Sequence, residues 1–182
     1  MIPKIKNILY STDLTENSAY AFRYAINSAV HHKANIHILH VLEIRLFPVS
    51  PPGEEGTGTL YEGPLYVEKL QKFDSEQKKP AKEKIKKRLK DFCQKELRGK
   101  SGLLKRVVSI DITEGDPASQ ILQKADEVEA DLVIMGTHGK GWLAHAFLGS
   151  VAESVLHRIK IPIFIIPLPE KRDTNLSDVE KP

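Results

Sequence analysis

The chain has 182 residues, of which 41% are hydrophobic and 28% are charged, and its net charge is +3. Such a chain suffices for one globular domain with a substantial core but is too short for two. It has no apolar run near the roughly 20 residues of a membrane helix, and its single cysteine, Cys93, excludes an intramolecular disulfide framework. Because the first residues also lack a secretory signal, we expect a cytoplasmic protein.

The positive charge is concentrated in one stretch. Eight basic residues and one acidic residue, Glu83, lie between Lys78 and Lys90. We interpret this stretch as the solvated face of a helix rather than as a nucleic-acid interface. Neither interleaved aromatic residues nor a known nucleic-acid motif accompanies the lysines.

Apolar runs alternate with helical patterns along most of the chain, which predicts an α/β fold with a five-strand parallel sheet and four covering helices. In chain order, the predicted elements are a strand at residues 5–10, a helix at 19–29, a strand at 35–42, a helix at 81–98, a strand at 107–113, a helix at 118–129, a strand at 131–135, a helix at 150–158 and a strand at 161–166.

Local signals support several of these boundaries. Asp116 and Pro117 are an N-cap and a favoured first residue for the helix at 118–129. Gly99 is a suitable end for the helix at 81–98. Pro162 and Pro167 bracket the last strand, which favours a position at the sheet edge.

Two segments break the alternation. Prolines and glycines punctuate residues 44–80, where we expect an inserted loop or lid with a short helix near 66–73. Residues 169–182 are polar and are expected to form a loose tail after a single domain at 1–168. His37 and His40, in the second strand, are expected to pack or lie at the surface, since no partners with metal-ligand spacing are present.

A glycine-rich segment follows the apolar strand at 131–135. It reads Gly136-Thr-His-Gly139, and Gly149 and Ser150 then open a helix. Glycine lets backbone N–H groups approach a bulky anion, and a helix N-terminus carries partial positive charge. The segment is therefore a candidate cradle for a polyphosphate, with the alternative that its glycines serve only tight turns.

Two further candidates follow other strands, namely Asp13 after the first strand and Val41 at the end of the second. Ligands of open α/β sheets bind at the carboxyl ends of strands, so we expect these residues to meet the glycine segment in a site for an adenine nucleotide. Asp13 can accept hydrogen bonds from ribose hydroxyls or cap the next helix. Val41 can offer an apolar surface to the base or pack in the core. Both alternatives stay open.

The candidate site includes neighbours of these residues, and His138 and Lys140 can add positive charge to its loop. The full set is Thr12, Asp13, Val41, Met135, Gly136, His138, Gly139, Lys140, Gly149, Ser150 and Val151. The chain contains no complete P-loop, nucleophile elbow or zinc-ligand pattern. We therefore predict no catalytic residue and no protein metal ligand, and we expect a binder rather than a committed enzyme.

The spacing Gly136-x2-Gly139-x9-Gly149-Ser150 resembles the ATP-binding signature of the universal stress proteins. Other segments also match this family, and the resemblance covers nearly all of residues 1–168. These segments are Ile8-Leu-Tyr-Ser-Thr-Asp13, Glu114-Gly-Asp-Pro117, Asp131-Leu-Val-Ile-Met-Gly136, Gly149-Ser-Val-Ala-Glu-Ser-Val-Leu156 and Ile161-Pro-Ile-Phe-Ile-Ile166.

The resemblance implies a Rossmann-like three-layer sandwich with strand order 3-2-1-4-5. It also implies ATP as the ligand, with ribose at Asp13, the base near Val41, and phosphates at Gly136, Gly139, Gly149 and Ser150 together with Mg²⁺ or Mn²⁺. By the same resemblance we expect a homodimer through the last strand, at 161–166. The implied role is that of a stress-response regulator or sensor with at most weak ATPase activity.

Two features depart from the family pattern. The insertion at 44–80 is long and adjoins the expected base site, where it can cover or fill the pocket, and Lys140 stands where arginine is common. An alternative function is therefore an interaction module that does not bind nucleotide. Such a module would bind a protein partner through the 44–80 insertion and the lysine-rich helix.

Overall fold

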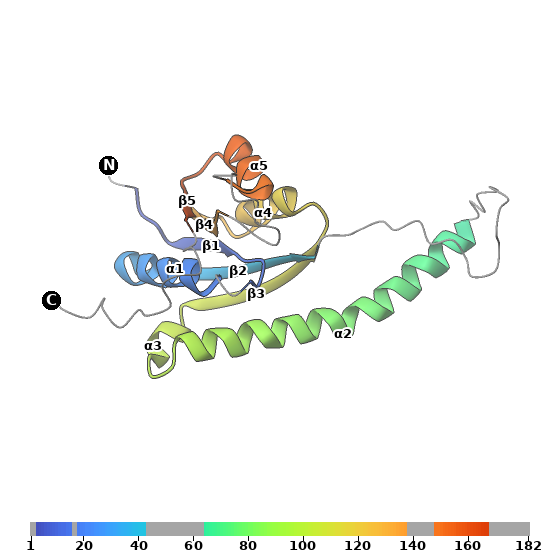
Figure 1. Cartoon of the computed structure of the whole chain (residues 1–182), viewed down its shortest axis with the longest axis horizontal. Helices are drawn as coiled ribbons and strands as arrows, with labels where there is room; N and C mark the ends of the chain where they lie inside the picture. Colours follow the sequence, from blue (N-terminus) through green and yellow to red (C-terminus); the bar gives the residue numbers. More distant parts are fainter. Residues whose placement is uncertain (1–2, 16–17, 43–63, 138–147, 168–182) are drawn as a thin grey trace.

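A computed structural model of the chain describes residues 3–15, 18–42, 64–137 and 148–167, and for residues 64–78 it describes the backbone alone. These residues form five strands and five helices (Figure 1). In chain order they are β1 (Asn7–Ser11), α1 (Ser18–His32), β2 (Asn35–Leu42), α2 (Pro64–Glu96), α3 (Ser101–Leu104), β3 (Val107–Glu114), α4 (Pro117–Glu127), β4 (Leu132–Gly136), α5 (Ser150–Arg158) and β5 (Ile163–Ile166).

The five strands form one parallel sheet in the order β3-β2-β1-β4-β5. This order confirms the predicted fold class. The central strand β1 pairs with both β2 and β4, so Ile8 faces Ile36 on one side and Leu132 on the other. Strands buried on both faces are expected to be continuously apolar, and Ile8, Leu9 and Tyr10 are at most 1% exposed.

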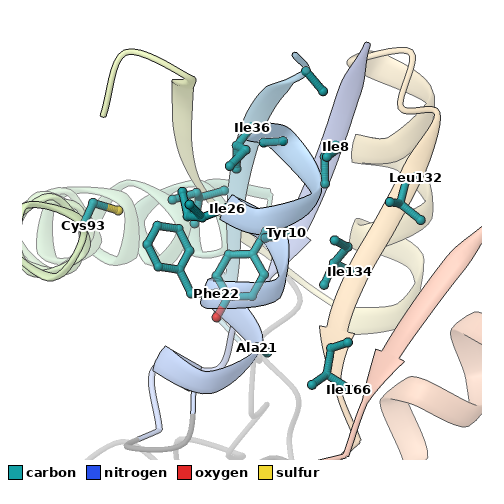
Figure 2. Close-up of a cluster of buried hydrophobic side chains, with 14 of the residues drawn as sticks. Ile8, Tyr10, Ala21, Phe22, Ile26, Ile36, Cys93, Leu132, Ile134 and Ile166 are labelled. Carbon is teal, nitrogen blue, oxygen red and sulfur yellow. The ribbon is translucent and has the colours of Figure 1, made fainter. Parts of the chain in front are cut away.

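Helices cover both faces of the sheet, so the fold has three layers. Alternate residues of β1, β2 and β4 pack against α1 and α2, where the rings of Phe22 and Tyr10 form a tilted pair (Figure 2). Phe22 also forms a tilted pair with Phe92 of α2. The intervening strand residues, such as Leu9 and Val133, pack against α4 and α5. The alternation of side chains along each strand thus divides the core into two clusters.

The caps and the sheet edge agree with the sequence signals. Asp116 precedes α4, and its Oδ2 accepts a hydrogen bond of 2.8 Å from the N–H of Ser119, while Pro117 is the first helical residue. Hydrogen bonds from the side chain and the N–H of Ser119 hold the pKa of Asp116 below its usual value. Gly99 lies just beyond α2 with a positive φ of 79°, which suits glycine at a helix end. β5 is an edge strand, as predicted.

The structure differs from the sequence analysis in the helices. Four were expected, but the described residues contain five, because the four-residue helix α3 follows α2. α2 itself begins at Pro64 rather than 81, and Pro80 lies inside it. The sequence suggested a break there because proline removes an N–H and clashes with the preceding turn. Leucine, glutamate, lysine and glutamine, which favour helix, predominate on either side of Pro80.

Some expectations fall on residues outside the described part. They concern the insertion before residue 64, the loop at 138–147 and the tail at 169–182, so a lid over the site stays a prediction. Among the described residues, no helix combines the length and apolar character needed to cross a membrane.

Candidate functional site

The candidate site lies at the carboxyl ends of the three inner strands. Asp13 follows β1, Val41 is the penultimate residue of β2, and Gly136 ends β4. Because β1 pairs in parallel with both neighbours, these ends share one rim of the sheet. This is the convergence that the sequence suggested.

The turn after β1 gives Asp13 two different carboxylate oxygens. Its Oδ1 accepts hydrogen bonds from the N–H and the hydroxyl of Thr15, at 3.1 and 2.9 Å. Its Oδ2 is buried and has no hydrogen-bond partner. A buried acceptor without a partner is costly, so this oxygen suits a hydroxyl donor supplied by a ligand. Asp13 organises the turn before α1 and keeps one oxygen free.

The same turn is held from two sides. The carbonyl of Thr12 accepts a 2.8 Å hydrogen bond from Nδ1 of His40, and the Thr12 hydroxyl accepts one of 3.2 Å from the N–H of Leu14. The Tyr10 hydroxyl donates to the carbonyl of Ser18 at 2.7 Å, which ties the first turn of α1 to β1. Thr12 and His40 therefore position the backbone beside Asp13.

Val41 lies on the face of the sheet that α4 and α5 cover, where it is half-buried against their cluster. Its register partner on β3 is Thr113. Partners in a parallel pair present their side chains on the same face, so Thr113 extends this wall by one strand. The Thr113 hydroxyl is buried without a hydrogen-bond partner. The sequence analysis missed Thr113, because its place beside Val41 depends on the register of β2 with β3.

The other side of the rim is formed by β4 and the start of α5. The N–H of Gly149 donates to the carbonyl of Thr137 at 2.7 Å, so the chain returns to the end of β4 before α5 begins. Gly149 is the N-cap residue of α5 and has no side chain with which to cap it. The partial positive charge of this helix terminus therefore lies at the rim, beside Gly136.

The remaining predicted residues have different positions. Ser150 and Val151 lie in the first turn of α5, whereas Met135 is buried in the cluster beneath α4 and α5. His138, Gly139 and Lys140 lie outside the described residues. Within the described part, no group of three histidine, cysteine or carboxylate side chains can hold a metal ion.

The geometry defines an α/β protein with a candidate site at the carboxyl rim of its parallel sheet. The universal stress protein family model matches residues 4–167. The chain therefore belongs to the universal stress protein family.

Individual relatives agree with this assignment. Universal stress protein MJ0531 of Methanocaldococcus jannaschii is 30% identical over 91% of this chain and 84% of its own length. The solved structure of MJ0577, from the same organism, has a TM-score of 0.67 at 23% identity and covers 92% of this chain and 99% of that one. The structure of UspA from Lactobacillus plantarum has a TM-score of 0.58 at 20% identity, with coverages of 91% and 99%. At these identities the two structures support the fold alone.

Proposed function

We propose that this universal stress protein binds ATP at the rim formed by Asp13, Val41 and the start of α5. The observation that carries the proposal is the buried Oδ2 of Asp13, which has no hydrogen-bond partner. It lies at the end of the central strand, between an apolar wall and a helix N-terminus. A nucleotide has a hydroxyl-bearing ribose between an apolar base and an anionic phosphate chain, in the same order.

Each part of the nucleotide then has a partner in the chain. Asp13 accepts hydrogen bonds from ribose hydroxyls, and Val41 packs against the base, with Thr113 beside it. The N–H groups at the start of α5 and the Ser150 hydroxyl bind phosphate oxygens, because a helix N-terminus favours negative charge. The segment from Gly136 to Lys140, with His138 and Gly139, completes the phosphate cradle in this proposal.

A divalent ion fits this arrangement through the nucleotide. The described residues offer no cluster of three ligand side chains, and Mg²⁺ keeps several waters and prefers phosphate oxygens to an all-protein cage. Mg²⁺ or Mn²⁺ would accordingly be held mainly by the bound nucleotide, and the Ser150 hydroxyl is the side-chain oxygen at the start of α5 that could assist. The ion would supply charge neutralisation of the phosphates.

The role that we propose is that of a cytoplasmic stress-response regulator or sensor whose state depends on bound ATP. The site as described consists of binding groups, and the proposal includes no catalytic residue. At most a weak ATPase activity is part of the proposal, in line with the family resemblance.

Replacement of Asp13 by asparagine tests the ligand and its orientation together. Asp13→Asn keeps the size of the side chain. It places either an amide NH₂ group or a neutral carbonyl oxygen, which is a weaker acceptor, where the free carboxylate oxygen was. We expect the affinity for ATP with Mg²⁺, measured by isothermal titration calorimetry, to fall at least tenfold, as for a lost hydrogen bond to a charged group.

Asp116→Asn is the matched control, because it makes the same chemical change in a carboxylate whose Oδ2 already caps α4. It should leave ATP affinity within about twofold of that of the unmodified protein. This change is small compared with the loss expected when one hydrogen bond to a charged group is removed. An unmodified protein that gives no heat with 1 mM ATP would refute nucleotide binding. Equal affinities of the protein and Asp13→Asn would refute the role of Asp13.

A further inference from the structure

A groove runs along the edge of the sheet that is farthest from β5. It is a cavity of about 450 Å³ beside β3, lined by Lys86, Lys90, Cys93, Gln94, Leu104, Val107, Val108, Ser109, Ile110 and Asp111. Five of these residues, 107–111, are consecutive in β3. Since consecutive side chains point to opposite faces, a cavity lined by all five lies along the strand edge rather than over one face. α2 runs alongside β3 and forms the other wall (Figure 1).

The edge of β3 presents backbone groups that can pair with another strand. The N–H of Gly115 donates to the carbonyl of Leu42 on β2, at 3.1 Å. The side to which a residue directs its N–H and C=O alternates along a strand, so Asp111 and Thr113 also face β2. Ile110 and Ile112 then direct these groups outward. No strand among the described residues pairs with this side of β3.

The opposite wall carries positive charge at a spacing that suits an extended chain. Lys86 and Lys90 are one helical turn apart, or about 6 Å along α2. Residues i and i+2 of a strand lie about 6.7 Å apart on one face. Neither lysine forms an ion pair with a described residue, whereas Lys82 pairs with Glu114 at 2.8 Å.

We propose that this groove binds an extended acidic peptide, which adds to β3 as a sixth strand. Backbone hydrogen bonds to Ile110 and Ile112 would hold the peptide, as in other cases of strand addition. Two carboxylates two residues apart would contact Lys86 and Lys90. This site is separate from the nucleotide rim and does not depend on it.

The carboxylate in the lining does not oppose an acidic ligand. Oδ2 of Asp111 accepts a 2.7 Å hydrogen bond from the Ser109 hydroxyl and lies 3.3 Å from Nζ of Lys124. Its charge is thereby neutralised on the α4 face of the sheet, away from α2. Cys93 is 1% exposed, and burial raises the pKa of its thiol to about 12, so it contributes a neutral apolar surface.

Charge also distinguishes an acidic peptide from a second copy of this chain. Two copies joined through β3 would place both lysine-rich helices at the same interface. The described part of α2 from Lys79 to Glu96 carries eight basic and three acidic residues, so like charges would face each other across that interface. Such juxtaposition is unfavourable, which leaves an acidic partner as the better fit.

A labelled heptapeptide, Thr-Val-Glu-Val-Glu-Val-Thr, tests the groove in the full-length protein. Fluorescence anisotropy at 0.15 M salt should detect binding, and the Thr-Val-Lys-Val-Lys-Val-Thr peptide should bind at least tenfold more weakly. The double variant Lys86→Glu with Lys90→Glu should lose at least tenfold in affinity for the acidic peptide. Amide exchange of Ile110 and Ile112, measured by NMR, should slow when the peptide binds, while Asp111 and Thr113 should change little.

The control variant combines Lys84→Glu with Lys87→Glu, which changes the helix charge equally at two exposed positions outside the groove. It should retain affinity within about threefold, because exposed charges that make no direct contact with the peptide contribute little. Any of four results would overturn the proposal. The first is no binding at 1 mM peptide, and the second is an equal loss of peptide affinity in both double variants. The third is unchanged affinity for a peptide N-methylated at alternate residues. The fourth is displacement of the peptide by single-stranded DNA, with no slowing of amide exchange at Ile110 or Ile112.

Discussion

At the scale of single residues, two buried oxygen atoms without hydrogen-bond partners distinguish the candidate site. They belong to Asp13, which follows β1, and to Thr113 on β3, and these two strands flank β2. Asp13 was predictable because it follows an apolar strand and matches a family motif. Thr113 was not, because its importance depends on its register with Val41, and register is a property of strand pairing.

Replacing Thr113 by valine separates the effect of its hydroxyl on the free energy of unfolding from its effect on the affinity for ATP. Thr113→Val removes a buried hydroxyl that lacks a partner, so we expect the free energy of unfolding without nucleotide to rise by about 1 kcal/mol. ATP affinity should fall about fivefold, as for one neutral hydrogen bond. Urea unfolding and calorimetry measure the two effects.

Thr113→Ser, which keeps the hydroxyl, is the control for binding. Its ATP affinity should stay closer to that of the unmodified protein than the affinity of the valine variant. A valine variant that is less stable, or one that binds ATP as tightly as the unmodified protein, would contradict this role of Thr113.

At the scale of elements, helix boundaries could be predicted where the local sequence signals agreed with one another. Asp116 and Pro117 marked the start of α4 correctly. The predicted start of α2 was wrong: residues 44–80 were expected to form an insertion, but the helix begins at Pro64 and continues through Pro80. A single proline costs a helix about 3 kcal/mol, which neighbouring turns and packing can offset.

The cap of α4 gives a prediction about pH. The pKa of Asp116 is lowered in the folded protein by its hydrogen bond to Ser119, so the carboxylate stabilises the fold above its ordinary value of 3.8. This contribution is lost as the pH falls through the lower, folded value. Asp116→Ala should reduce the free energy of unfolding by about 1 kcal/mol at pH 7, the usual value of an N-cap.

Urea unfolding at a series of pH values measures this effect. The difference between Asp116→Ala and the unmodified protein should shrink as the pH drops below about 4, where first the unfolded chain and then the folded cap takes up a proton. A difference that stays constant down to pH 2 would mean that the charge of Asp116 does not contribute.

At the scale of the whole molecule, the two edges of the sheet differ in character. On β5, the side chain of Phe164 is 46% exposed, and the other residues of the strand are isoleucines. β3 lies beside the lysine-rich α2 (Figure 1). An apolar edge favours a second copy of the chain and a basic edge disfavours one, so we predict the homodimer at β5 and propose the acidic peptide at β3.

Sedimentation equilibrium tests the dimer. Phe164→Glu places a charge at the proposed interface and should raise the dissociation constant of the dimer at least tenfold, the cost of burying an unpaired charge in place of an aromatic anchor. Val30→Glu is the control, since Val30 is 42% exposed but lies on α1. A monomeric unmodified protein, or equal dissociation of both variants, would contradict an interface at β5.

The sequence by itself determined the fold class, the succession of strands and the family. Periodicity and caps are local, and the family segments cover nearly all of the domain. It also singled out Asp13, Val41 and the Gly136 segment, because strand ends can be recognised from neighbouring residues. Only the tertiary structure brought Thr113 beside Val41, left one oxygen of Asp13 unpaired and aligned Lys86 and Lys90 with the edge of β3. These features depend on register and on packing between residues distant in the chain, which a local pattern does not encode.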